Sequence, residues 1–315
     1  MDAKYELRVP VALFFYNRVD LLSLLLRRIN QVYIPKLFLI SDGPDSKKPT
    51  DLELVKSSRD LFKDLKNVGE IVPYYREENV GLYKNVKEGI DFVFSHTDAA
   101  IFLEDDVIPD ISFFPFCEEM LEVYRNKPNI FMIQGAHTLN STKAQRLTRD
   151  SYFFSRYPSV GWGWASWGHK WAEYYDGELK SALPIWERRE IMNKFKKRSE
   201  YEYWSEKFNR IRLTRHTWDA QVILAFFLHN LFSVVPSKNL VKNMGLNRPD
   251  ATHTTGPSIW ETLPLEAIDF PLIHPKSISA NKAYDKLRSD FVAPSIFHRI
   301  HKRIFKMFRR KWKNT

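Results

Sequence analysis

The first 135 residues alternate between short apolar runs and longer segments with helical periodicity. Short apolar runs bounded by turn residues predict buried strands, and apolar residues that recur every three or four positions predict helices packed on a sheet. A repeated strand and helix alternation is typical of a parallel sheet covered by helices. The expected strands are residues 9–15, 36–41, 69–75, 99–103 and 130–133, and the expected helices are residues 19–30, 50–66, 82–95 and 111–125.

The pattern changes after residue 135. Residues 136–157 have mixed polarity and are interpreted as a connection, and residues 162–230 contain Trp-rich and charged segments with helical periodicity. Beyond residue 234 the chain is rich in proline, which resists long helices. We therefore expect an α/β fold with a mostly parallel central sheet. It divides into an α/β half at 1–135, a helical and loop-rich half at 136–293, and a tail at 294–315.

The composition limits the class of protein. A chain of 315 residues with 44% apolar and 15% aromatic residues can bury a sizeable core. Cys117 is the single cysteine, so no internal disulfide is possible, and a reducing compartment is favoured. The charged N-terminus is followed by an apolar run too short for a signal peptide or a membrane span. These features predict a cytoplasmic protein.

The net charge of +10 is concentrated in the tail. Residues 294–315 contain eight Lys and Arg residues and no acid, which leaves +2 for the rest of the chain. Apolar residues recur there at every fourth position from Ile296 to Trp312, the pattern of a basic amphipathic helix. Such a helix either lies on an anionic membrane surface or docks on its own domain, and both interpretations stay open. A nucleic-acid-binding arm is the weakest of the three, so no nucleic-acid partner is expected.

Three consecutive carboxylates, Glu104, Asp105 and Asp106, directly follow the expected strand 99–103. Acidic triplets are more often part of a solvated surface. Here the apolar run 99–103 precedes the triplet without a turn, so at least one carboxylate stands at the edge of the sheet. Ligands of open α/β sheets bind beyond the carboxyl ends of strands, and Mg²⁺ or Mn²⁺ is commonly held by one or two carboxylates together with substrate phosphates. The triplet therefore predicts a divalent cation and a nucleotide diphosphate.

Three other expected strand ends contain polar residues suited to a nucleotide. Arg18 follows the first strand, and its guanidinium can fork onto a phosphate or a base carbonyl. Asp42 follows the second strand and can accept a hydrogen bond from a pyrimidine N–H. Asn79 follows the third strand, just before a helix whose free N–H groups favour anions. The structural alternatives are a surface arginine, a turn aspartate before glycine, and a helix N-cap.

Aromatic residues in the second half suggest a sugar site. Trp162 and Trp164 belong to the segment Gly-Trp-Gly-Trp-Ala-Ser-Trp, and Trp218 precedes an expected helix. Sugars stack their apolar C–H faces on aromatic rings, and glycines let the backbone approach a ligand. The alternative is that these indoles belong to the core.

Two further residues are candidates for the chemistry. Asp219 lies in the first turn of a helix that Thr217 is expected to cap. It either complements the helix dipole or acts as the general base for an attacking hydroxyl. His253 lies in an expected loop and is a candidate metal or phosphate contact, although a lone loop histidine is more often neither.

The order of these motifs resembles the nucleotide-diphosphate-sugar transferases of the GT-A fold. The resemblance covers about residues 9–253 and is nearest to inverting N-acetylglucosaminyltransferases of the Golgi type I kind and to bacterial sugar transferases labelled haemolysin-like. Its specific parts are the Leu-Glu-Asp-Asp strand end and the downstream Trp-Asp. It implies a nucleotide-sugar-binding first half and an acceptor-binding second half.

The resemblance also implies a role for each candidate residue. The nucleotide site would contain Arg18, Asp42, Asn79, Asp105 and, at the ribose, Glu104. The metal site would contain Asp106 and, more weakly, His253, and the sugar site would contain Trp162, Trp164 and Trp218. The catalytic base would be Asp219.

The function expected from this resemblance is metal-dependent transfer of a hexose with inversion. The donor would be a UDP-sugar, with N-acetylglucosamine the first choice, the cofactor Mn²⁺ or Mg²⁺, and the acceptor a saccharide or a lipid-linked saccharide of a bacterial surface glycan. The expected location is the inner face of the cell membrane, which the tail at 294–315 would contact. One alternative is a sugar-phosphate nucleotidyltransferase, although the sequence has no glycine-rich basic phosphate loop near its start. Another is a non-enzymatic membrane-binding protein that acts through its tail.

Overall fold

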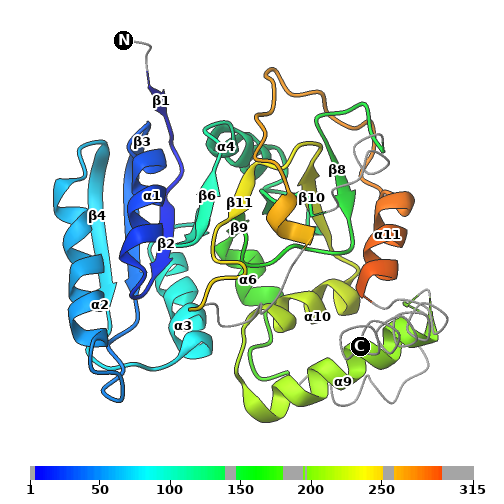
Figure 1. The fold of residues 1–315 in the computed structure, drawn as a ribbon. Coiled ribbons are helices and arrows are strands. Elements are labelled where there is room, and N and C mark those ends of the chain that lie inside the picture. The colour runs from blue at the N-terminus through cyan, green and yellow to red at the C-terminus, as the bar shows by residue number, and fades with distance from the viewer. Residues whose placement is uncertain (1–3, 139–146, 180–193, 196, 251–258, 293–315) are drawn as a thin grey trace, which may run out of the picture.

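The computed structural model describes residues 4–138, 147–179, 194–195, 197–250 and 259–292. In these residues a mostly parallel central sheet is flanked by helices, which confirms the α/β fold class (Figure 1). The tail at 294–315 and His253 lie outside the described residues, so the expectations for them stay predictions.

The described strands form a nine-stranded sheet with the order β4, β3, β2, β5, β9, β7, β10, β8, and β1 pairs with the start of β3. The pairs among β4, β3, β2 and β5 are parallel. β9 is antiparallel to both β5 and β7, so β5 and β7 run in the same direction. The bounds are β1 Tyr5–Glu6, β2 Val11–Phe15, β3 Val32–Ser41, β4 Val68–Tyr75, β5 Ala99–Glu104, β7 Ile130–Gln134, β8 Tyr152–Ser155, β9 Trp164–Trp167 and β10 Phe232–Pro236.

The helices cover both faces of the sheet, as the alternation of side chains along each strand requires. In β2, Val11 and Leu13 pack in one core cluster, with α1 and α4, whereas Ala12 and Phe14 pack in the other, with α3, α6 and α10. The bounds are α1 Val19–Ile29, α2 Asp51–Asp60, α3 Leu82–Phe94, α4 Phe113–Val123, α6 Gly168–Tyr174, α9 Arg198–Thr214, α10 Asp219–His229 and α11 Lys282–Val292, with 3₁₀ turns at Leu61–Asp64 and Ile259–Thr262.

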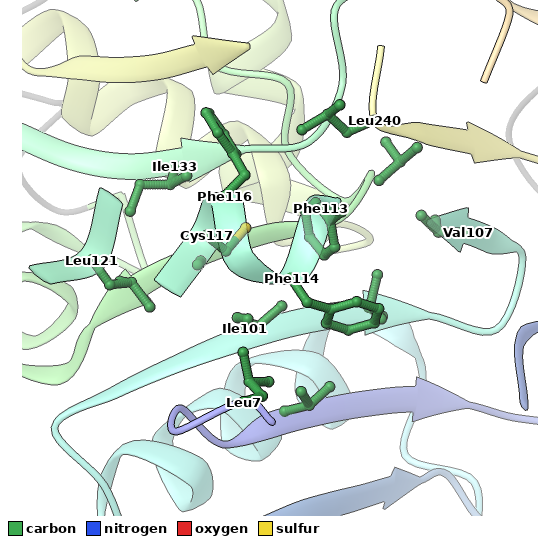
Figure 2. Close-up of a cluster of buried hydrophobic side chains, with 14 of the residues drawn as sticks. Leu7, Ile101, Val107, Phe113, Phe114, Phe116, Cys117, Leu121, Ile133 and Leu240 are labelled. Atoms are coloured by element: carbon green, nitrogen blue, oxygen red, sulfur yellow. The ribbon is translucent and has the colours of Figure 1, made fainter. Parts of the chain in front are cut away.

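The core under α4 joins the two halves of the sheet. Figure 2 shows Phe113, Phe114 and Cys117 of α4 packed with Ile101 of β5, and all four are fully buried. A second small sheet pairs β6, Val107–Pro109, with β11, Val241–Asn243. Because β6 follows the acidic triplet, this pairing brings a distant segment of the chain to the end of β5.

The expected elements of the first 135 residues are confirmed, with ends that move by a few residues. The expectations for the rest are partly wrong. The predicted connection contains β8, the Trp-rich segment contains β9, and the proline-rich region contains β10, β11 and α11. β9 is four residues long, and its place in the sheet depends on partners about 30 to 65 residues away, which local periodicity cannot detect.

A buried lysine connects α6 to the end of α4. Lys170 is 1% exposed, and its Nζ donates to the carbonyl oxygens of Tyr124 at 2.9 Å, Lys127 at 3.0 Å and Ile130 at 2.8 Å. Lys170→Met leaves these carbonyls without a donor, so we expect the free energy of unfolding to fall by about 2–4 kcal/mol. Urea denaturation measures this. Lys87→Met, which removes a half-exposed ion pair, should change it by at most about 1 kcal/mol, and equal losses in the two variants would contradict the prediction.

Candidate active site

The carboxyl ends of β2, β3, β4 and β5 meet at one edge of the sheet. The register pairs Phe14 with Glu104, Phe15 with Ser41, and Ser41 with Tyr75. The residues that follow these strands therefore lie on a common rim, as parallel pairing requires.

Two members of the acidic triplet at the end of β5 are buried, and Glu104 is partly buried. Asp105 is 7% exposed and Asp106 is 9% exposed. Arg18, the residue before α1, places its Nη1 3.1 Å from Asp106 Oδ2 and 3.6 Å from Asp105 Oδ1. The backbone N–H of Tyr16 donates to Asp105 Oδ2 at 3.3 Å. Within the described residues, Arg18 is the only cation paired with these carboxylates, so the triplet keeps an excess of negative charge.

Burial and mutual repulsion raise the pKa values of the triplet. Burial raises the pKa of Glu104 well above its usual range, and repulsion from Asp106, Asp105 and Asp219 adds to the effect. Burial, followed by repulsion from Asp106, raises the pKa of Asp105 to about 7, and burial also raises the pKa of Asp106. The site is therefore electrostatically poised to receive positive charge.

These shifts predict how the stability of the metal-free protein changes with pH. The folded state keeps a proton on Asp105 up to about pH 7, whereas the unfolded chain releases that proton at about pH 4. The folded state binds more protons than the unfolded chain between these pH values. The contribution of Asp105 to the free energy of unfolding is therefore most favourable below pH 4 and is lost as the pH rises to 7. Urea denaturation in the presence of a chelator measures the slope. Asp105→Asn should flatten it, and an unchanged slope would contradict the assignment.

A segment far along the chain holds Asp106 in place. Met244 N donates to the carbonyl oxygen of Asp106 at 2.7 Å, and Asn243 Nδ2 lies 3.4 Å from Asp106 Oδ1. A Cβ at Gly245 would lie 2.1 Å from Asp106 Oδ2, so only glycine permits this approach. Sequence reasoning missed this segment, and the Asn-Met-Gly run after a short apolar stretch was the available signal of a turn.

Arg18 is also held by Asp250. Its Nη2 donates to the carbonyl oxygen of Asp250 at 3.2 Å, and its Nε lies 3.5 Å from Asp250 Oδ2. Arg248 pairs with both Asp250 and Asp20. The predicted phosphate-binding arginine is thus engaged by carboxylates in this structure.

Asp42 and Asn79 connect the turns after β3 and β4. Asp42 is 6% exposed, and its carboxylate accepts hydrogen bonds from the N–H groups of Gly43 and Val80 at 2.9 Å and of Gly81 at 3.0 Å. Asn79 Nδ2 donates to the carbonyl oxygen of Gly43 and to the Tyr16 hydroxyl, both at 3.0 Å. The alternative that Asn79 caps α3 is wrong, because Gly81, with a φ of +82°, holds the N-cap position. Both side chains shape the rim.

The structure corrects the sugar-stacking prediction for two of the three indoles. Trp164 is 2% exposed and stacks on Phe102 with ring centroids 4.3 Å apart, and Trp218 is 4% exposed and lies 5.8 Å from Trp164. Their faces are covered by the core, which leaves no surface for a sugar. Trp162 is only partly buried and meets Trp260 edge to face with ring centroids 5.2 Å apart, so sugar stacking on Trp162 stays a prediction.

Asp219 is the first residue of α10, and Trp218, not Thr217, holds the N-cap position. The Thr217 hydroxyl donates to the Asp219 carboxylate, and Lys207 Nζ lies 3.9 Å from Asp219 Oδ2. The side chain is 32% exposed, which keeps it accessible to a ligand hydroxyl. Its repulsive effect on Glu104 places Asp219 within electrostatic range of the triplet.

The donor set favours a hard cation that needs few protein ligands. In the described residues, no group of three or more His, Cys, Asp or Glu side chains is arranged to hold a metal ion. Asp105 and Asp106 offer carboxylate oxygens only, the ligands that Mg²⁺ and Mn²⁺ accept when water and phosphate complete the shell. The residues therefore fit such a cation bound together with a phosphate ligand, and they do not form a closed site of the zinc type.

Comparisons with known proteins add little to this geometry. The chain matches no family model and no curated protein. The structures that match include the crystal structure of GalNAc-T7 with UDP, GalNAc and Mn²⁺, at 14% sequence identity and a TM-score of 0.37. That match covers 55% of this chain and 38% of the other, so this chain spans less than half of its length. A likeness of this size assigns neither a fold family nor an activity. No helix in the described ranges is long and apolar enough to cross a membrane.

Proposed function

We propose that this protein is a metal-dependent glycosyltransferase that moves a hexose from a UDP-sugar to a saccharide or lipid-linked acceptor, with inversion at the anomeric carbon. N-acetylglucosamine is the first choice of sugar, and bacterial surface-glycan synthesis the proposed context. One observation supports the proposal most strongly: two buried carboxylates, Asp105 and Asp106, follow the partly buried Glu104 at the end of a central strand, and in the described residues they share one guanidinium, that of Arg18. The order of motifs along the chain supports it independently.

The charge balance explains why a cation and a diphosphate belong together here. The cost of burying several carboxylates is removed when a divalent ion joins them. A bound ion would supply positive charge to the diphosphate, and Arg18, released from Asp105 and Asp106, could then fork onto a phosphate. The nucleotide then lies along the ends of β2, β3 and β4, next to Asp42 and Asn79.

Each residue then has a definite task. Asp106 would hold Mn²⁺ or Mg²⁺, which when bound neutralises charge on the departing diphosphate. Glu104 accepts hydrogen bonds from the ribose, and Trp162 offers its indole to a sugar. Asp219 takes the proton of the acceptor hydroxyl while that oxygen attacks the anomeric carbon, and the bond to the diphosphate oxygen breaks on the opposite face.

Thermal unfolding against a panel of nucleotide sugars, with and without Mn²⁺, tests the proposal. A ligand at 100 times its Kd adds about 2.7 kcal/mol, which raises the Tm of a protein of this size by roughly 4 °C. We expect this shift only with UDP-sugars and only with metal. A shift produced by a nucleoside triphosphate together with a sugar phosphate would instead favour a nucleotidyltransferase.

A peripheral position at the inner face of the membrane is part of the same proposal. It rests on the eight cations and the apolar repeat of residues 294–315. Vesicle sedimentation of the full chain tests it. Binding to anionic vesicles and not to neutral ones supports the proposal, and absence of binding to both kinds of vesicle contradicts it.

A further inference from the structure

A buried arginine lies beyond the end of β7. Arg288, in α11, is 9% exposed, and its Nη1 donates to Thr138 Oγ1 at 2.7 Å. Thr138 Oγ1 also lies 3.4 Å from Ser159 Oγ and 3.5 Å from the Tyr284 hydroxyl. Thr138, Ser159, Tyr284 and Arg288 are here named the arginine cluster. Each of its four members is at most 9% exposed.

The charge of Arg288 has no counter-ion in the described part of the chain. No carboxylate forms an ion pair with it, and its Nε is buried without a hydrogen-bond partner. Asp285, one turn earlier in α11, directs Oδ1 to Ser155 Oγ at 2.7 Å. The segments that adjoin the cluster in sequence, 139–146 and 293–315, contain no acidic residue and several cations. A buried cation without a counter-ion is costly, and a bound anion would remove that cost.

A buried histidine beside the cluster has one ring nitrogen without a partner in the described residues. His137 is 4% exposed, and its Nδ1 lies 3.1 Å from the carbonyl oxygen of Ser237. A carbonyl only accepts, so Nδ1 carries the hydrogen and Nε2 is an acceptor, for which the described residues offer no donor. Burial, and then the charge of Arg288, lower the pKa of His137, which keeps the ring neutral. Its ring centroid lies 5.5 Å from that of Tyr284.

The arginine cluster lies on the acceptor side of the proposed active site. Ser159 N donates to Oε1 of Gln134, the last residue of β7, at 2.9 Å. Two residues later, Gly161 approaches Glu104, and a Cβ there would lie 3.2 Å from Glu104 Oε1. The ends of β5 and β7 are separated by β9, hence by two strand spacings or roughly 10 Å. The nucleotide strands β2, β3 and β4 lie on the opposite side of β5 in the order of the sheet, and Figure 1 shows them apart from β9 and β10.

We propose that the arginine cluster is an anion-binding subsite that recognises a phosphate group on the acceptor. The guanidinium of Arg288 presents forked donors that match phosphate oxygens, the Ser159 hydroxyl adds a donor, and His137 Nε2 accepts from a neighbouring hydroxyl. The inference rests on the proposed function, which it deepens: the acceptor is a phosphorylated saccharide or a lipid phosphate carrying a saccharide. The spacing of roughly 10 Å between the ends of β5 and β7 leaves room for a sugar between the phosphate and the reacting hydroxyl.

Titration of inorganic phosphate into the metal-free, nucleotide-free full chain by calorimetry tests the subsite. We expect saturable binding that weakens at least tenfold in Arg288→Gln. Arg212→Gln is the matched control, because Arg212 also has a buried Nε without a partner but belongs to α9. The affinity of the Arg212→Gln variant for phosphate should stay within threefold of the wild-type affinity. Equal affinity in wild type and Arg288→Gln would mean an adventitious ion only. A loss in Arg18→Gln with none in Arg288→Gln would place the phosphate in the donor site, and either outcome overturns the proposal.

Two further measurements keep the subsite testable if Arg288→Gln does not fold. When phosphate is titrated, the ¹⁵Nε resonance of Arg288 should shift with the Kd that calorimetry gives, and an unmoved resonance overturns the proposal. The Thr138→Val variant should bind phosphate more weakly than the wild type. Binding of glucuronate in preference to phosphate also overturns it. In transfer assays, removing the phosphate from a sugar-phosphate or a lipid-phosphate acceptor should raise the KM for that acceptor at least tenfold. The acceptor whose KM rises more identifies whether the recognised phosphate belongs to a sugar or to a lipid. Arg288-dependent phosphate binding without sugar transfer would remove the proposed function and leave the subsite.

Discussion

Asp219→Asn should abolish sugar transfer and leave nucleotide affinity unchanged. The amide keeps the size of the side chain and can still accept from the Thr217 hydroxyl, but it cannot take a proton from the acceptor. General-base catalysis contributes about 10²–10⁴-fold, so kcat should fall by that factor. Steady-state kinetics with a UDP-sugar and calorimetry with UDP measure the two effects separately.

Glu206→Gln is a suitable control for Asp219→Asn. Glu206 is an exposed carboxylate in α9, next in sequence to Lys207, which pairs with Asp219. Its removal changes the local charge by the same amount without removing the proposed base. Normal turnover in Asp219→Asn would place the base elsewhere or indicate a retaining mechanism.

Asp106→Asn should remove the metal dependence of nucleotide binding. A carboxylate that binds a divalent ion directly cannot be replaced by an amide at equal affinity, so we expect the Kd for UDP in the presence of Mn²⁺ to rise about 100-fold, about 2.7 kcal/mol. The variant should fold, because one fewer buried negative charge relieves repulsion on Glu104 and Asp105. Calorimetry with UDP, with and without Mn²⁺, measures the change.

The matched control lies at the other end of the same strand. Asp98 is exposed and precedes β5, so Asp98→Asn removes one carboxylate without touching the rim. It should bind UDP and Mn²⁺ as the wild type does. If Asp98→Asn and Asp106→Asn weaken binding equally, the effect comes from overall charge and not from a metal ligand.

The sequence predicted the first half of the fold well because its signals are local. A strand such as β2 is a short apolar run, and α1 and α3 repeat their buried positions at helical spacing, so each element is readable without its partners. β9 and β10 are four and five residues long and are stabilised by pairing with distant strands. Their existence depends on tertiary contacts, which periodicity does not contain.

The candidate site was partly predictable for a related reason. Parallel pairing alone brings Arg18 to Asp105 and Asp106, because all three follow neighbouring strands. The contributions of Asn243 and Gly245 depend on the pairing of β11 with β6 across more than 130 residues. The stacking prediction was wrong for Trp164 and Trp218 because the same indole suits a sugar site and a core equally well from the sequence.

Anomalous diffraction from a crystal grown with UDP and Mn²⁺ tests the central proposal most directly. We expect one manganese peak within direct coordination distance, about 2.1 Å, of a carboxylate oxygen of Asp106, and we expect the Arg18 guanidinium to turn toward phosphate. A structure in which UDP binds elsewhere, or in which Asp106 still pairs with Arg18 and no manganese lies beside it, would contradict the account.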